Sequence, residues 1–292
     1  MVRNEQDFVD VDKIDIHKIP PLHEISVDRV GVSDVDFLLT VETVSKENVI
    51  VDARLDMFGS LLKDIKGIDM SRFSEVLMQW TDKPLSSLTL KDLLLHLKKS
   101  VKAADVYVSA SFRYFMKKQA PVTKLDQLVA YPCKFVGVLN KVGYTFIHEV
   151  QVPVMSLCPC SKERCLVDRE RDIGKGAHNQ RGIITLQVKC QPGSFYIEDL
   201  VKLAESCGSA EIYSLLKRPD EEYVTRVSYE NPKFVEDIVR ETAAKVKELP
   251  GVSWFRAKVE NFESIHHHSA VAYISKQKYG KGGWKASTKG FY

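Results

Sequence analysis

The sequence predicts an α+β protein in which antiparallel sheets carry helices on one face. Residues 106–114 alternate apolar with more polar side chains, which is the pattern of a half-buried strand. Residues 90–101 place leucines at helical spacing, which is typical of an amphipathic helix. Because both patterns recur along the chain, we expect strands and helices in each half.

The expected elements follow the order strand-strand-helix-helix-strand-strand, and this order occurs twice. In the first half the expected ranges are 35–44, 48–57, 72–80, 90–101, 106–114 and 134–140. In the second half they are 144–155, 182–190, 197–206, 232–249, 254–261 and 270–275. Asn231 as the N-cap and Pro232 at the first helical position are expected to begin the helix over 232–249.

Two large units are therefore predicted, with their boundary near residues 141–143. Residues 1–33 are expected to form an irregular lead, residues 34–142 the first unit, residues 143–277 the second, and 278–292 a mobile tail rich in Lys and Gly. The first unit has no cluster of Cys, His and Glu and is interpreted as a structural copy. Each unit would leave sheet edges that other subunits can pair with.

The composition is that of an ordinary globular protein. The chain has 292 residues, is 28% charged and carries a formal net charge of +3, so total charge gives no support for nucleic-acid binding. No apolar run resembles a signal peptide or is long enough to span a bilayer, and we expect a cytoplasmic protein without a membrane partner. Its six cysteines are then thiols or metal ligands rather than disulfides.

Three of these cysteines cluster in one segment. Residues 156–163 read SLCPCSKE, and residues 176–181 read GAHNQR. Cys and His are ligands for zinc, iron and similar metals, and one Cys, one His and a distant carboxylate would leave a coordination position for water. From spacing alone, a catalytic metal, a structural zinc and a buried thiol pair remain as alternatives.

Five motifs together resemble the type IB GTP cyclohydrolase family over roughly residues 30–277. They are SLCPCSKE (156–163), GAHNQR (176–181), LKRPDE (216–221), YENPKFVED (229–237) and ENFESIH (260–266). The resemblance implies the tunnelling fold, with two tandem ββααββ units, and a homotetramer with active sites between subunits. It also implies hydrolysis of GTP to 7,8-dihydroneopterin triphosphate and formate, the first step of folate and pterin biosynthesis.

The resemblance assigns roles to individual residues. It implies a divalent transition metal, Zn, Mn or Fe, held by Cys158, His178, Glu221 and Glu263. Cys160 matches the partner thiol and is not expected to be a ligand. Glu236 matches the residue that binds the guanine ring, and His266 is a candidate for proton transfer. The residues that could contact the triphosphate are Lys162, Arg181, Lys217 and Arg218.

The chain departs from the family pattern in two places. Cys158 and His178 lie twenty positions apart, and the additional residues, within 164–173, are expected to form a surface loop. Cys165 therefore competes with Cys158 as the metal thiol. The family more often separates two His with a different residue, whereas His266 and His268 here flank His267.

Three rival functions stay open. One is a sister GTP cyclohydrolase that yields a cyclic phosphate product. Another is a nitrile reductase of the same fold family, which uses a cysteine nucleophile and NADPH. The third is a non-catalytic, zinc-stabilised assembly module, which would bind metal without turning over GTP.

Overall fold

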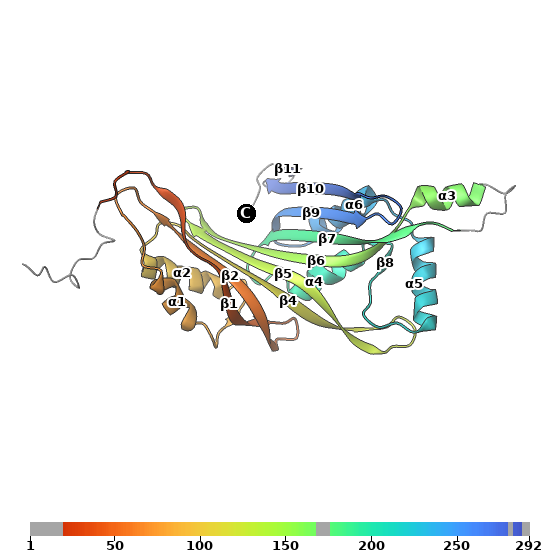
Figure 1. The fold of residues 1–292 in the computed structure, drawn as a ribbon, viewed down its shortest axis with the longest axis horizontal. Helices are drawn as coiled ribbons and strands as arrows, with labels where there is room; N and C mark the ends of the chain where they lie inside the picture. Colours follow the sequence, from red (N-terminus) through yellow and green to blue (C-terminus); the bar gives the residue numbers. More distant parts are fainter. Residues whose placement is uncertain (1–19, 168–175, 280–282, 288–292) are drawn as a thin grey trace, which may run out of the picture.

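The strands of both halves form one continuous sheet (Figure 1). The computed structural model describes residues 20–167, 176–279 and 283–287. The strand order is β11-β10-β9-β7-β6-β5-β4-β2-β1-β3, and β8 pairs with β6. Every pairing is antiparallel except that of β1 with β3. The strands are β1 Val27–Glu42, β2 Asn48–Leu61, β3 Pro84–Leu85, β4 Val106–Gln119, β5 Asp126–Asn140, β6 Gly143–Leu157, β7 Asn179–Cys190, β8 Ala210–Glu211, β9 Val252–Phe262, β10 Ser269–Tyr279 and β11 Gly283–Ala286.

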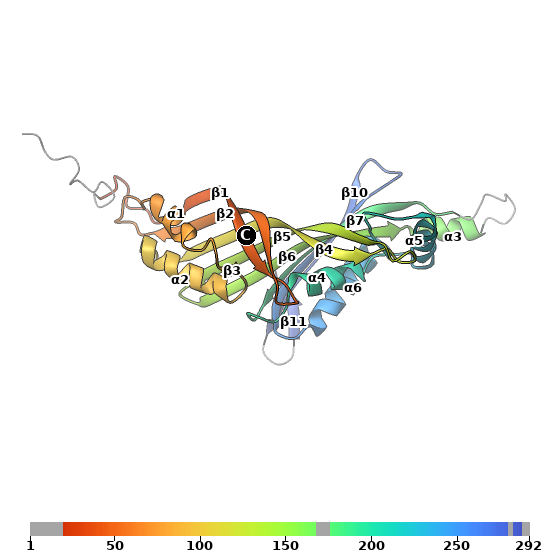
Figure 2. The same ribbon diagram turned by 90° about the horizontal axis from the view of Figure 1, so that it is seen from below.

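Three helices pack along one side of this sheet, which Figure 2 shows from below. Helix α2 contacts β4 and β5, α4 contacts β6, and α6 contacts β9 and β10. Helix α1 packs on α2, while α3 and α5 lie together at one end of the molecule. The helices are α1 Ser71–Met78, α2 Thr89–Val101, α3 Pro159–Val167, α4 Ile197–Glu205, α5 Arg218–Glu230 and α6 Val235–Glu248.

The core lies between the helices and the sheet face that they cover. In β7 the apolar side chains of Ile184, Leu186 and Val188 are fully buried, and the residues between them are partly exposed. This period of two is the alternation that the sequence showed, and burial of the apolar set on one face selects the strand register. Cys133, Cys190 and Cys207 are buried free thiols, as expected of small core residues.

The prediction of a tunnelling fold made of two tandem ββααββ units was wrong. The two halves are not separate sheets, since β5 pairs with β6 along residues 133–140 and joins them. The second half also departs from the expected order, because α3 separates β6 from β7 and α5 and β8 are additional elements. Element order along a chain does not determine which strands pair, and here the long hairpin of β5 and β6 makes the sheet continuous.

Several element boundaries also differ from those expected. Strand β1 begins at Val27, inside the expected irregular lead, because it pairs with the full length of β2. Residues 164–167 belong to α3 rather than to a loop, and residues 168–175 lie outside the described part of the chain. Residues 283–286 of the expected tail form β11 on β10. Among the described helices, none is long and apolar enough to cross a membrane.

The helix expected from Pro232 begins instead at Val235. Asn231 is the C-cap of α5, and its N–H donates to the carbonyl of Val227. Pro232 has no N–H with which to continue α5. The next N–H, that of Lys233, donates to the carbonyl of Leu157 at 3.1 Å, so residues 231–234 cross to β6 before α6 starts.

Candidate functional site

Three strand ends meet beside α3. Cys158 directly follows β6, His178 directly precedes β7, and Glu263 directly follows β9. The pairing of Leu157 with Asn179 brings the first two together, and the Cys158 N–H donates to the His178 carbonyl at 3.1 Å. The antiparallel register therefore makes neighbours of two residues that lie twenty positions apart in the sequence.

Gln180 connects the side chains of His178 and Glu263. The Nδ1 atom of His178 lies 3.0 Å from the Gln180 Oε1, and the Gln180 Nε2 donates to the Glu263 Oε1 at 3.3 Å. Because Oε1 can only accept, Nδ1 carries the proton in this hydrogen bond, which leaves Nε2 of a neutral ring with its lone pair free. We call Cys158, His178, Gln180 and Glu263 the strand-end site.

Sequence reasoning missed Gln180, although a signal for it was present. His178 and Gln180 are two positions apart at the start of a strand, so their side chains point to the same face. Gln180 is 9% exposed, and a buried amide needs partners. The motif GAHNQR therefore contained an orienting residue next to its histidine.

Helix α3 determines where the thiols lie. Pro159 is its first residue, a position that proline favours, and the Lys162 N–H donates to the Cys158 carbonyl at 3.2 Å. Cys158 is half-buried at the helix start and Cys160 is exposed. Cys165 lies seven positions after Cys158, which corresponds to roughly 10 Å along the helix axis at about 1.5 Å per residue. This placement favours Cys158 over Cys165 as the thiol beside His178.

The segment that leads into α6 is attached to the same strand ends. The Ser156 hydroxyl donates to the Lys233 carbonyl at 3.2 Å and accepts from the Asn261 amide at 2.8 Å. Ser156 and Asn261 are both buried. This chain of contacts holds the start of α6, which carries the exposed Glu236 in its first turn, next to β6 and β9.

The predicted metal ligands are only partly brought together. Glu221 is exposed in the first turn of α5. Among the described residues, no group of three or more Cys, His, Asp and Glu side chains is close enough to hold one metal ion. Thiol, imidazole and carboxylate are nevertheless the donor types that suit zinc, iron or manganese. The donor chemistry fits a transition metal, and a complete ligand set is not assembled within the described part of one chain.

The residues predicted to contact the triphosphate or to transfer protons differ in exposure and in the contacts that they make within the chain. Lys162 donates to the Tyr229 carbonyl and lies 4.5 Å from the centre of the Tyr229 ring, so its charge is used within the protein. Arg181, Lys217 and Arg218 are exposed. His266 lies in the turn between β9 and β10 rather than in a strand, and its ring stacks on that of His268 at 5.3 Å.

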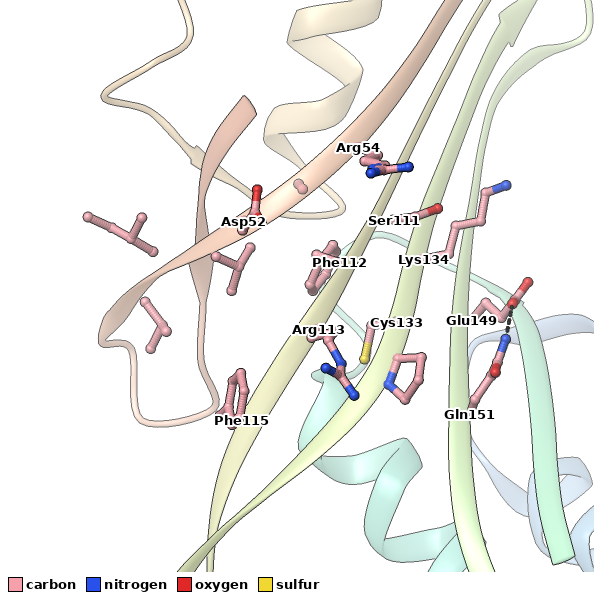
Figure 3. A pocket seen from close by; sticks show the side chains of 15 residues that line it. Asp52, Arg54, Ser111, Phe112, Arg113, Phe115, Cys133, Lys134, Glu149 and Gln151 are labelled. Carbon is pink, nitrogen blue, oxygen red and sulfur yellow. Dashed lines mark hydrogen bonds between the residues drawn. The ribbon is translucent and has the colours of Figure 1, made fainter. Parts of the chain in front are cut away.

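A separate pocket of about 580 Å³ lies where β2 and β4 diverge beyond the pairing of Ala53 with Phe112 (Figure 3). Its lining includes basic side chains, such as Arg113 and Lys134, and acidic side chains, such as Asp52 and Glu149. None of the predicted site residues lines this pocket. It is therefore not part of the strand-end site.

Comparison with solved structures shows proteins of similar fold. The uricase from Arthrobacter globiformis aligns with a TM-score of 0.51 at 10% sequence identity, covering 87% of this chain and 95% of its own. The uricase from Bacillus fastidious aligns with a TM-score of 0.50, also at 10% identity, covering 86% of this chain and 94% of its own. At such identities the likeness concerns the fold alone, and the sheet order of this chain, not these neighbours, is what contradicts the two predicted units.

Sequence comparisons identify the family to which the chain belongs. A protein-family model described as type I GTP cyclohydrolase folE2 matches residues 14–272. The GTP cyclohydrolase FolE2 of Geotalea uraniireducens is 40% identical over 268 residues, which is 92% of this chain and 95% of that protein. The GTP cyclohydrolase FolE2 of Syntrophobacter fumaroxidans is 41% identical over 268 residues, covering 91% of this chain and all of that protein. The chain therefore belongs to the type I GTP cyclohydrolase folE2 family.

Proposed function

We propose that this chain carries out the type IB reaction, in which GTP is hydrolysed to 7,8-dihydroneopterin triphosphate and formate. Family membership supports the substrate, and the strand-end site is the observation that supports the location of the chemistry. Cys158, His178 and Glu263 come from three different strand ends, and a buried amide orients two of them. Such convergence of polar groups onto rigid strand ends is typical of a catalytic site.

A divalent transition metal is part of this proposal. Cys158 and His178 would hold it together with a carboxylate from Glu221 or Glu263, and a bound metal lowers the pKa of water so that hydroxide becomes available near neutral pH. The free Nε2 of His178 is a suitable ligand atom, since Gln180 occupies Nδ1. Zn, Mn and Fe are all compatible with this set.

The protein side chains account for the other requirements of the reaction. Water must add to C8 of the guanine ring, and the Glu263 carboxylate can accept its proton. His266 can then donate a proton to the imidazole nitrogen that is released when the ring opens. Glu236 can accept hydrogen bonds from N1–H and the 2-amino group of guanine. Arg181, Lys217 and Arg218 are exposed and can contact the triphosphate.

We further propose a homotetramer with its active sites between subunits. Strand β10 pairs with β11 only over residues 276–279, and β1 pairs with β3 only at residues 40–41. Long outer edges of β10 and β1 are thus unpaired within the described part of the chain, and pairing with another chain would satisfy them. A second subunit would also supply the ligands that one chain does not bring together.

The decisive experiment is to incubate metal-reconstituted protein with GTP and to detect formate and, after oxidation, a fluorescent pterin. Chelation should abolish both products, and a divalent transition metal should restore them. Cys158→Ala should be inactive, whereas Cys165→Ala should keep most activity. Turnover in stringently metal-free protein would contradict the metal, and loss that follows Cys165 would contradict the assignment of the thiol.

The same assay separates the rival functions. A cyclic phosphate on the product would indicate the sister enzyme class. Consumption of NADPH with a nitrile substrate, without formate from GTP, would indicate a nitrile reductase. Bound metal with no turnover of either substrate would indicate an assembly module.

A further inference from the structure

The β4–β5 hairpin of the first half reaches the helix that carries Glu221. Strand β4 pairs with β2 only as far as Phe112, whereas its pairing with β5 continues to Gln119. The last part of the hairpin therefore projects beyond β2, and Figure 1 shows its end beside α5. We call residues 118–128 the hairpin tip.

The turn of the hairpin tip surrounds one buried carboxylate. The Oδ1 atom of Asp220 accepts hydrogen bonds from the N–H groups of Val122 and Thr123, at 2.8 and 2.9 Å. Its Oδ2 atom accepts from the Thr123 hydroxyl at 2.7 Å and from the Lys217 N–H at 3.0 Å. Asp220 is fully buried, so these four donors replace the water that it has lost.

Two more side chains of the hairpin tip hold the segment that precedes α5. The Gln127 Oε1 accepts from the N–H groups of Ser214 and Leu215, at 2.6 and 2.8 Å, and its Nε2 donates to the Leu215 carbonyl at 3.1 Å. The Lys118 ammonium donates to the Ile212 carbonyl at 3.2 Å and pairs with Glu205 and Glu211. Both Gln127 and Lys118 are largely buried.

Helix α5 has little apolar packing of its own to fix its position. Its buried side chains are Asp220, Val224 and Ser228, of which only Val224 is apolar. The Glu221 N–H donates to the Lys217 carbonyl at 2.9 Å, so Glu221 lies in the same turn as the buried Asp220. The direction in which Glu221 points therefore depends on polar contacts made by the hairpin tip.

We propose that the hairpin tip positions Glu221 for the reaction, with Thr123 and Gln127 as positioning residues that act through Asp220 and residues 214–215. This inference rests on the proposed function, because that function gives Glu221 its role. It also gives the first half a part in the active site. A purely structural role would stabilise the fold without affecting Glu221.

Thr123→Val tests the inference with the smallest change, since it removes the hydroxyl that donates to Asp220 and keeps the side-chain shape. The matched control is Thr43→Val in the β1–β2 turn. Thr43 is also buried, and its Oγ1 accepts from the Glu47 N–H at 3.1 Å within its own turn. Gln127→Met is the second variant, and Thr123→Ser, which keeps the hydroxyl, is the rescue.

Three quantities are measured on each full-length, metal-reconstituted variant: kcat and KM for GTP, the metal dissociation constant by equilibrium dialysis, and hydrogen exchange of residues 216–224. Thr123→Val and Gln127→Met should exchange faster in this segment, bind metal about tenfold more weakly and lose about tenfold in kcat with KM little changed. Thr123→Ser should resemble the parent, and Thr43→Val should change only the melting temperature.

Glu221→Gln separates failure of this inference from failure of the proposed function. If Glu221→Gln is inactive while Thr123→Val and Gln127→Met behave like Thr43→Val, the hairpin tip does not position Glu221 and the inference alone is overturned. If Glu221→Gln keeps full turnover and metal binding, the role proposed for Glu221 is wrong, and the inference is overturned with it even if exchange in 216–224 has changed.

Discussion

At the residue scale, His148 is a fully buried imidazole whose pKa lies well below its ordinary value. It lies on β6 with its ring edge-on to Phe135 and Phe146, at centroid distances of 5.1 and 4.6 Å. Neither ring nitrogen has a hydrogen-bond partner among the described residues. Burial lowers the pKa of His148 from 6.5 to about 3, so the ring is neutral in the folded protein at neutral pH.

This burial predicts acid sensitivity of the fold. Below its ordinary pKa, the unfolded chain protonates His148 while the folded protein does not, so the free energy of unfolding falls as the pH drops from 6.5 towards about 3. Between about pH 7 and about pH 5 the loss should be about 2 kcal/mol. Urea denaturation at both pH values measures it. His148→Phe, which suits the aromatic surroundings, should lose that much less on acidification, and an unchanged loss would contradict the assignment.

Gln180 is the second residue whose role follows from its contacts. Gln180→Leu removes the acceptor for His178 Nδ1 and the donor to Glu263 while it keeps an apolar volume in a buried position. Metal affinity or activity should fall by about 10–100-fold, the usual cost of losing an orienting partner.

Gln187→Leu is the matched control for that prediction. Gln187 lies on the same strand, and its amide donates to Glu149 at 2.7 Å, far from the strand-end site. This variant should keep metal affinity, measured by equilibrium dialysis, and GTP turnover, measured by formate release; both are also measured for Gln180→Leu. Equal losses in the two variants would mean that Gln180 acts only on stability.

At the element scale, the start of α6 determines what Glu236 can do. Phe234 is the N-cap, and its N–H donates to the Asp237 Oδ2 at 3.1 Å. Glu236 lies in the same first turn, and its side chain is exposed. The hydrogen bond that caps the helix is made by Asp237 and not by Glu236. As a surface carboxylate it would contribute only a few tenths to about 1 kcal/mol through the helix dipole.

Glu236 is expected to contribute much more to substrate recognition. Glu236→Gln presents an NH₂ group to the N–H donors of guanine, so kcat/KM for GTP should fall by about 10²-fold or more. Metal content should not change, since the residue is not a ligand. Steady-state kinetics and metal analysis test both statements, with Glu248→Gln at the far end of α6 as the control. Near-normal turnover of Glu236→Gln would move the guanine contact to another carboxylate.

Helices α3 and α5 were not predicted from the sequence, and there is a physical reason why each was missed. The inward positions of α5 are Asp220, Val224 and Ser228, which have helical spacing but are mostly polar, so no apolar stripe marks the helix. Helix α3 has no pronounced apolar face either and begins at Pro159 within the cysteine motif. Elements that are held by polar contacts with distant parts of the chain leave little local signal.

At the scale of the whole molecule, the described part of the sheet leaves long outer edges on β1 and β10 and brings together only part of the proposed metal ligands. We expect the active species to be a homotetramer of the 33.1 kDa chain. Sedimentation velocity should show a species of four chains, and GTP turnover should be found with that species. Mixing inactive Cys158→Ala with inactive Glu221→Gln should restore some activity if the two residues meet across an interface. A compact, active monomer would contradict this prediction.

Local residue type and spacing were enough to predict a GTP cyclohydrolase, most strands, the apolar faces and the motifs that contain Cys158, His178 and Glu263. That β5 and β6 join both halves into one sheet could be seen only in the folded chain. The same is true of the contacts by which Gln180 links two site residues and by which the hairpin tip holds Asp220. These features depend on strand register and on buried polar groups that find partners far away in the chain, and neither is encoded in a local pattern.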